Sequence, residues 1–312
     1  MELRRAGRSG LLVSSLGLGT MTWGRDTDEH EAAEQLSLFL DAGGTLIDTA
    51  ASYGDGAAEA LLGSLLAEVD RRDVVLCSKA GVRHTSRGSR LDASRATLLD
   101  TLDESLAALG TDHLDLWLVQ SHDADAPLEE TLSALRHAVA TGRTRYAGLS
   151  NHPAWYQGYA AASLGADATG LAAVEVEYSL LQRGVEQEVL PGARALGAGV
   201  LAWSPLGRGV LTGKYRSTIP ADSRAASPHL RGFVEPYLTD RARGVVEAVA
   251  TAADGLGRTP LEVALAWVRD VPGVSSAIVG ARTAAQLRGV LAGTDLELPD
   301  AIRRALDDVS AA

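Results

Sequence analysis

Residues 15–50 read SLGLGTMTWGRDTDEHEAAEQLSLFLDAGGTLIDTA, and this stretch contains the pattern that predicts the fold. Its two ends, residues 15–20 and 45–50, are short apolar runs of the kind that form buried strands. Between them, residues 28–41 carry apolar side chains at helical spacing and are followed by Gly43 and Gly44, which stop a helix. The stretch therefore predicts one strand–helix–strand unit of a parallel sheet.

The same alternation of short apolar runs and helical segments extends along the rest of the chain. Further strands are predicted at residues 74–78, 114–119, 146–150, 172–176, 200–204 and 276–279. Further helices are predicted at residues 57–69, 93–109, 128–141, 186–196 and 260–269. With the first two strands the total is eight, the number found in a (β/α)8 barrel. We therefore predict an α/β fold in which residues 1–312 form one domain, a single (β/α)8 TIM barrel.

Two segments lie outside this repeat. Residues 2–8 and 11–14 predict a short N-terminal β-hairpin, which turns at residues 8–10 and precedes the first barrel strand. Residues 205–236, rich in Gly, Pro, Ser and Arg, are too long for an ordinary connection between elements. We expect this second segment to be either a functional loop or a flexible one.

The composition limits the classes of partner. The chain has 29 Lys plus Arg against 40 Asp plus Glu, and its net charge of −11 opposes the phosphate attraction that nucleic-acid binding needs. No stretch has the roughly 18 uninterrupted apolar residues of a membrane span, and from residues 1–10 we expect no secretory signal. The single cysteine, Cys77, cannot form an internal disulfide. We expect a soluble cytoplasmic protein that binds neither nucleic acid nor a membrane, with its oligomeric state open.

Two common kinds of cofactor site are disfavoured. The seven histidines show no metal-ligand spacing, so no metal site is predicted. The run YGDGAAE at residues 53–59 begins like the glycine-rich turn of a dinucleotide-binding Rossmann unit. Glu59, however, stands where a small third residue would let helix and strand pack closely, so the run does not predict that unit.

Three ionisable side chains fall at or just beyond the ends of two successive strands. Asp48 ends one strand, Tyr53 lies in the loop that follows, and Lys79 ends the next strand. In a barrel all three project from the carboxyl-terminal rim, where active sites lie. We expect the Lys79 ammonium to lower the pKa of Tyr53, and Asp48 to keep that lysine charged. Each residue alone could be a cap, a packing side chain or a solvated charge, but together they predict a catalytic set that donates a proton to a developing alkoxide.

At these residues the chain resembles the aldo-keto reductases, in the branch that includes the potassium-channel β subunits and many bacterial reductases. The matching segments run in family order: GLGTM at 17–21, DTAASYGDGAAEALLG at 48–63, SK at 78–79, GLSN at 148–151, EYSLLQR at 177–183, WSPLGRGVLTGKY at 203–215 and VGART at 279–283. The resemblance implies hydride transfer from NADPH to a small carbonyl substrate, with Asp48, Tyr53 and Lys79 as catalytic residues.

The resemblance also implies where NADPH lies, with residues 205–236 folded over it as a lid. The nicotinamide would stack on Trp203. The 2′-phosphate of the adenosine would bind Arg282, Arg224 and Lys214. Among them Arg282 is the strongest candidate, because it precedes a helix whose N-terminal N–H groups favour anions. The implied cofactor-binding residues are Gly19, Thr20, Met21, Asp48, Ser150, Asn151, Glu175, Trp203, Ser204, Pro205, Leu206, Gly209, Lys214, Arg224, Gly280, Arg282 and Gln286.

Three positions depart from the family pattern. Gln120 stands where a histidine usually ends the fourth strand, Glu175 where a glutamine usually contacts the nicotinamide, and Val290 where an asparagine usually contacts adenine. We expect Gln120 to be a fourth catalytic residue that holds the substrate oxygen as a neutral donor. His122, two residues further on, is the less favoured alternative for that place.

These residues favour an NADPH-dependent reductase of an aldehyde, ketone or keto-sugar. Because Gln120 cannot supply a positive charge, reduction of an activated C=C or C=N bond stays an alternative. A second alternative is a cofactor-sensing binding subunit with vestigial activity, like the channel-associated relatives. The remaining conspicuous side chains, Trp117, Trp155, Trp267 and Cys77, are expected to pack in the interior.

Overall fold

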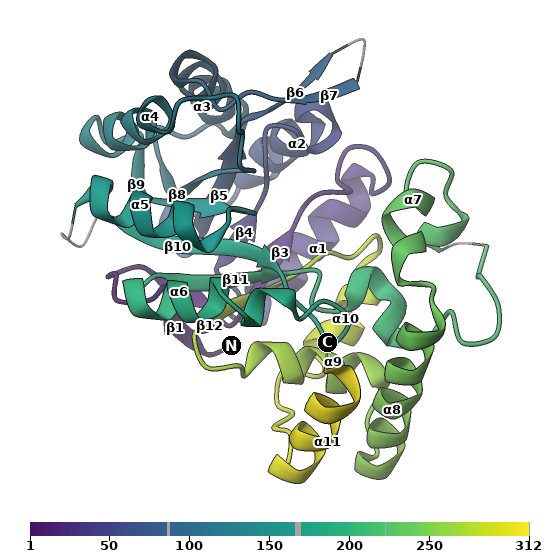
Figure 1. Cartoon of the computed structure of the whole chain (residues 1–312). Coiled ribbons are helices and arrows are strands. Elements are labelled where there is room, and N and C mark those ends of the chain that lie inside the picture. The colour runs from purple at the N-terminus through teal and green to yellow at the C-terminus, as the bar shows by residue number, and fades with distance from the viewer. Residues whose placement is uncertain (86–87, 166–169, 222, 312) are drawn as a thin grey trace.

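Eight parallel strands close into a barrel in the computed structural model, which describes residues 1–85, 88–165, 170–221 and 223–311 (Figure 1). The strands are β3 (Leu16–Gly19), β4 (Leu46–Asp48), β5 (Val75–Ala80), β8 (Leu114–Val119), β9 (Thr144–Ser150), β10 (Leu171–Glu177), β11 (Gly199–Trp203) and β12 (Val274–Val279). They follow one another around the barrel in chain order, and β12 pairs with β3 to close it. The predicted (β/α)8 barrel is therefore confirmed.

Helices surround the barrel (Figure 1). They are α1 (Glu29–Asp41), α2 (Ala57–Leu66), α3 (Arg95–Leu109), α4 (Leu128–Ala140), α5 (Ala154–Leu164), α6 (Val189–Leu196), α7 (Arg231–Val234), α8 (Asp240–Leu256), α9 (Pro260–Arg269), α10 (Ala284–Leu291) and α11 (Asp300–Ser310). Their starts have local causes: Asp28 caps α1, and Thr259 forms a capping box with Glu262 at α9. Within the described part of the chain, no helix is long and apolar enough to span a membrane.

The barrel interior is filled by side chains from alternate positions of its strands. This interior cluster includes Leu46, Cys77, Leu116, Leu118, Ala173, Leu201 and Ile278. Side chains of the opposite strand face, such as Ile47, Trp117 and Val174, pack beneath the helices. Successive side chains of a strand point to opposite faces, so the residue two positions beyond each interior side chain points into the mouth of the barrel. Asp48, Lys79 and Glu175 occupy such positions.

The predicted N-terminal hairpin is also confirmed, with β1 (Leu3–Arg5) antiparallel to β2 (Leu12–Ser14). It closes the amino-terminal end of the barrel, where Ala6, Leu11 and Val13 join the interior cluster. Gly7 has a φ of +59°, and a Cβ there would lie 2.1 Å from the carbonyl oxygen of Gly197. Only glycine therefore allows the hairpin to approach the barrel this closely.

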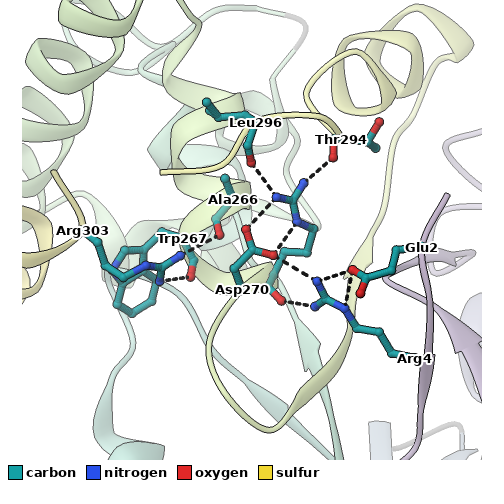
Figure 2. Close-up of polar contacts among 9 residues, drawn as sticks. Glu2, Arg4, Ala266, Trp267, Asp270, Thr294, Leu296 and Arg303 are labelled. Carbon is teal, nitrogen blue, oxygen red and sulfur yellow. Dashed lines mark hydrogen bonds and ion pairs between the residues drawn. The ribbon is translucent and has the colours of Figure 1, made fainter. Parts of the chain in front are cut away.

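An ion-pair network holds this hairpin to the last part of the barrel (Figure 2). Arg4 donates to the carboxylate of Asp270 at 3.1 Å and to the carbonyl oxygen of Arg269. Arg269 is buried, pairs with Asp270, and donates to the carbonyl oxygens of Thr294 at 2.7 Å and Leu296 at 2.6 Å. The network therefore joins the hairpin, the end of α9 and the segment after α10.

Several details differ from the sequence-based expectations. The chain after β5 forms an unpredicted hairpin, β6 (Val82–Thr85) with β7 (Gly88–Leu91), which extends outward beyond the helices (Figure 1). The helix predicted at residues 186–196 begins only at Val189, because Pro191 lacks an N–H and is tolerated only in a first helical turn. Trp117 and Trp267 are buried, but Trp155 lies at the start of α5 and is 59% exposed, so the expectation for Trp155 is wrong.

Candidate active site

A cavity of about 540 Å³ opens at the carboxyl-terminal ends of the barrel strands. All predicted site residues except Thr20 lie in its wall: Gly19, Met21, Asp48, Tyr53, Lys79, Gln120, Ser150, Asn151, Glu175, Trp203, Ser204, Pro205, Leu206, Gly209, Lys214, Arg224, Gly280, Arg282 and Gln286. Thr20 is buried instead, and its hydroxyl donates to the carbonyl oxygen of Asp48 at 3.1 Å.

Asp48, Lys79 and Tyr53 form the polar floor of this cavity. The Nζ atom of Lys79 donates to Asp48 Oδ1 at 2.6 Å and Oδ2 at 2.7 Å, and lies 3.3 Å from the Tyr53 hydroxyl. Burial by itself lowers the pKa of Lys79, but the carboxylates of Asp48 and Glu175 outweigh burial and raise it well above its usual value. The lysine is therefore a fixed cation next to the phenol.

The pKa of Tyr53 moves in the direction opposite to the one expected from the sequence. Burial raises it most, Lys79 lowers it, and the negative charges of Asp48 and Glu175 raise it further, so the net shift is upward. The expectation of a lowered pKa was wrong because it counted the lysine but not the burial. The hydroxyl consequently keeps its proton at neutral pH.

Gln120 and His122 lie in different environments. Gln120 is in the cavity wall, and its Oε1 accepts a hydrogen bond from Ser52 Oγ at 2.9 Å. His122 lies outside the wall and packs edge-on against the rings of His152 and Tyr156, at centroid distances of 5.8 and 5.2 Å. Since Ser52 engages the oxygen of the Gln120 amide, the amide nitrogen is the end that can donate to a ligand.

Glu175 is the second carboxyl group beside Lys79. It is 2% exposed, and its Oε1 lies 3.4 Å from Lys79 Nζ. With Asp48 and Cys77 it also forms a group of possible metal ligands, whose donor atoms lie within 4.8 Å of one another. The ammonium of Lys79 contacts both carboxyl groups of that set, closest to Asp48, and is the cation that the structure places beside them.

Backbone strain concentrates at the rim loops of the cavity. Asn151, Ser204 and Arg208 have positive φ values of 57°, 52° and 58°, a conformation that non-glycine residues seldom adopt and that often occurs at functional sites. Asn151 spans three strand ends, since it donates to the carbonyl oxygen of Gln120 at 3.0 Å and accepts from Trp203 Nε1 at 3.0 Å. The indole that borders the cavity is thereby held in place.

Sequence reasoning missed Arg208 as a site residue. It lies in the cavity wall, pairs with both oxygens of Glu177 at 2.8 and 2.7 Å, and donates to the carbonyl oxygen of Phe233 at 2.6 Å. It thereby joins the end of β10 to α7, in the predicted loop 205–236, of which the structure describes residues 205–221 and 223–236. The other unpredicted wall residues are Thr212, Phe233, Leu261, Ile278, Val279, Ala281, Ala285 and Gly289, and Val290 also lies there.

The far end of the cavity is cationic. Arg224 donates to the carbonyl oxygen of Gly280 at 3.3 Å, and Arg282 lies just before α10, with its backbone N–H bonded to Gln286 Oε1 at 3.0 Å. Burial, and then the neighbouring positive charge of Arg282, lower the pKa of Arg224. Lys214 lies over the left-handed Gly209, where a Cβ would come within 3.2 Å of the ammonium. Two adjacent guanidinium groups and a lysine form an arrangement suited to a phosphate.

The fold is a closed (β/α)8 barrel, an architecture whose active sites lie at the carboxyl-terminal ends of the strands. The sequence model of the aldo/keto reductase family matches residues 15–311, and the chain belongs to that family. Similar proteins include an uncharacterized oxidoreductase, YrpG, of Bacillus subtilis (strain 168), 35% identical over 99% of this chain and 96% of the relative. A probable voltage-gated potassium channel subunit beta of Arabidopsis thaliana is 33% identical over 95% and 92% of the two chains. The aldo-keto reductase YhdN of Bacillus subtilis (strain 168) is 30% identical over 93% and 88%.

Proposed function

We propose that this protein is an NADPH-dependent reductase of a small carbonyl compound, in which Tyr53 is the general acid. The observation that carries the proposal is one cavity with the Asp48–Lys79–Tyr53 set at its floor and a cationic end at Arg224 and Arg282. A cavity of about 540 Å³ is of the size that small ligands and cofactors occupy. We also propose that residues 1–312 act as one domain in the cytoplasm.

The donor set of the cavity fits NADPH. Burial lowers the pKa of Arg224 most and the positive charge of Arg282 lowers it further, so an anion beside the two guanidinium groups would offset their mutual repulsion. A 2′-phosphate supplies that anion and accepts charge-assisted hydrogen bonds from both guanidinium groups. Backbone N–H groups in the segment at Ser204, Leu206 and Gly209 would take the pyrophosphate.

Bound NADPH would supply the hydride, and residues of the chain would supply the proton and its stabilisation. Tyr53, which holds its proton at neutral pH, donates it to the substrate oxygen as that oxygen gains negative charge. Lys79, 3.3 Å from the phenol oxygen, stabilises the resulting phenolate, and Asp48 fixes the lysine. The Gln120 amide nitrogen orients the substrate oxygen as a neutral donor.

The alternative reaction keeps the same cofactor and reduces an activated C=C or C=N bond. The observation in its favour is Gln120, which borders the cavity and cannot add positive charge beside the substrate oxygen. Steady-state turnover with matched aldehydes, enones and cyclic imines separates the reactions. Activity confined to the enones or imines would reject the carbonyl assignment, and no turnover despite NADPH binding would favour a cofactor-sensing subunit.

Replacement of Arg282 by alanine is expected to weaken NADPH binding about ten- to a hundred-fold and to leave NADH binding nearly unchanged. The reason is the loss of a charge-assisted contact to the 2′-phosphate, which NADH lacks. Fluorescence titration with both cofactors measures the effect. Arg288→Ala is the matched control, because Arg288 lies on α10 outside the cavity wall and pairs with Glu34. Equal losses of affinity for both cofactors in the Arg282 variant would show that this arginine does not bind the 2′-phosphate.

Replacement of Gln120 by alanine is expected to lower kcat/KM by about ten- to a hundred-fold, because the substrate oxygen loses one hydrogen bond. His122→Ala is expected to leave both kcat/KM and its pH profile essentially unchanged, since His122 lies outside the cavity wall. The measurement is kcat/KM between pH 5 and 9 for both variants. A large loss in the His122 variant, with disappearance of an acidic limb, would make His122 the fourth catalytic group.

A further inference from the structure

Glu175 is a buried carboxyl group that the proposed reaction does not use. In β10 it lies between Ser150 of β9 and Leu201 of β11, and it points into the cavity. Asp48 takes the closest contacts to Lys79, at 2.6 and 2.7 Å, whereas Glu175 Oε1 is 3.4 Å away. The other carboxyl oxygen, Oε2, is buried and has no hydrogen bond to any residue that the structure describes. Glu175 is therefore a second acid beside a lysine that already has its counter-ion.

The charge of the cavity floor consequently depends on Glu175. Asp48 and Lys79 neutralise each other, so an ionised Glu175 adds one net negative charge and a protonated one adds none. Burial, reinforced by the negative charge of Asp48 and opposed by Lys79, raises the pKa of Glu175 to about 8. The change of charge thus falls within the pH range in which enzymes are assayed.

The other ionisable groups near Glu175 come from β5, from the chain after β4 and from β10 itself. Tyr53 and Cys77 face it from the chain after β4 and from β5, and burial raises the pKa of each above its usual value. On the same strand, Glu177 is paired with Arg208. Ser150 and Leu201, its neighbours on β9 and β11, carry no ionisable group. Burial therefore keeps the protons on Tyr53 and Cys77 in the pH range in which Glu175 ionises.

The reacting end of the cofactor must lie near this carboxyl group. Reduction adds a hydride and a proton to two bonded atoms of the substrate, so the ring that gives the hydride lies close to the Tyr53 hydroxyl. That hydroxyl is 3.3 Å from Lys79 Nζ, which in turn is 3.4 Å from Glu175. The oxidised nicotinamide ring carries a positive charge and the reduced ring carries none. An ionised carboxylate therefore interacts differently with the two forms.

We propose that Glu175 makes the preference for oxidised or reduced cofactor depend on pH, a role that rests on the proposed function. When protonated, Glu175 leaves the floor neutral and offers an O–H donor in the cavity. When ionised, it stabilises NADP⁺ relative to NADPH. The ratio of the dissociation constants, Kd(NADP⁺)/Kd(NADPH), therefore falls as the pH rises, on the order of ten-fold in total. Bound NADP⁺ also lowers the pKa of Glu175, so the fall begins below pH 8.

The test is to titrate both cofactors, without substrate, from pH 6 to 9.5 in the wild type and in Glu175→Gln. The 2′-phosphate titrates equally in NADP⁺ and NADPH, so it cancels in the ratio. We expect the ratio to fall in the wild type and to stay constant in Glu175→Gln, because glutamine keeps the shape without the charge. Glu59→Gln is the matched control. Glu59 is also buried, but it lies outside the cavity wall and accepts a hydrogen bond from Ser78 Oγ at 2.5 Å. In this variant the ratio of dissociation constants should still fall as the pH rises.

A second measurement needs no variant. Calorimetry near pH 8 in buffers of different ionisation enthalpy should show proton release when NADP⁺ binds to the wild type, and less when NADPH binds. A constant ratio in the wild type, a fall that persists in Glu175→Gln, or equal proton release with both cofactors would overturn the role of Glu175. Absence of binding by either cofactor at every pH would instead reject the proposed function.

Discussion

Replacement of Tyr53 by phenylalanine is expected to lower turnover by about 10²- to 10⁴-fold while NADPH binds nearly as in the wild type. The substitution removes the proton that the substrate oxygen receives but keeps the ring that packs in the cavity wall. Turnover with a reactive aldehyde and fluorescence titration with NADPH, on the same preparations, measure the two effects separately.

Tyr146→Phe is the matched control for this prediction. Tyr146 packs against the interior cluster of the barrel and does not line the cavity, so loss of its hydroxyl should leave turnover within a few fold of the wild type. If Tyr53→Phe also keeps turnover within a few fold, the proton comes from another group and the proposed mechanism is wrong.

Replacement of Lys79 by methionine is expected to reduce both turnover and stability. Turnover should fall by at least about 10²-fold, because no cation then stabilises the Tyr53 phenolate. The free energy of unfolding should fall by about 3 kcal/mol, since Asp48 and Glu175 lose the buried cation between them. The loss should be larger at pH 9 than at pH 6, because Glu175, whose pKa is raised to about 8, is neutral at the lower pH.

Urea unfolding at the two pH values measures this loss of stability. The double variant Lys79→Met with Asp48→Asn provides the control. It removes one of the two buried carboxylates that lack a cation in Lys79→Met, and should therefore recover part of the stability lost by the single variant. An unchanged free energy of unfolding in Lys79→Met at both pH values would show that the ion pair does not stabilise the fold.

The barrel could be predicted because its strands and helices carry strong local periodicity. The strand predicted at residues 114–119 coincides with β8, and the helix predicted at 260–269 coincides with α9. The hairpin of β6 and β7 could not be predicted, because its sequence is polar and lacks an apolar alternation. The exposure of Trp155 also could not be foreseen, because it depends on how the first turn of α5 faces solvent.

Most of the candidate site could be predicted because its residues stand at strand ends. Asp48, Lys79 and Glu175 continue the inward positions of their strands, so their convergence follows from the barrel itself. Arg208 was missed because its role depends on contacts with Glu177 of β10 and Phe233 of α7, which are distant from it in the sequence. The upward pKa shift of Tyr53 was missed because burial is a property of the assembled cavity, and no local sequence pattern records it.

The network of Arg4, Arg269 and Asp270 anchors the fold at the end of the barrel away from the chemistry. The hairpin and this network contact the amino-terminal ends of the strands, as in the bond from Ser275 Oγ to the carbonyl oxygen of Arg5. The cavity is built at the carboxyl-terminal ends. Rim segments such as β6 and β7 can therefore be exchanged or diversified without disturbing that anchor. The chain is thus suited to loop grafting, in which new substrate specificities are sought on an unchanged frame.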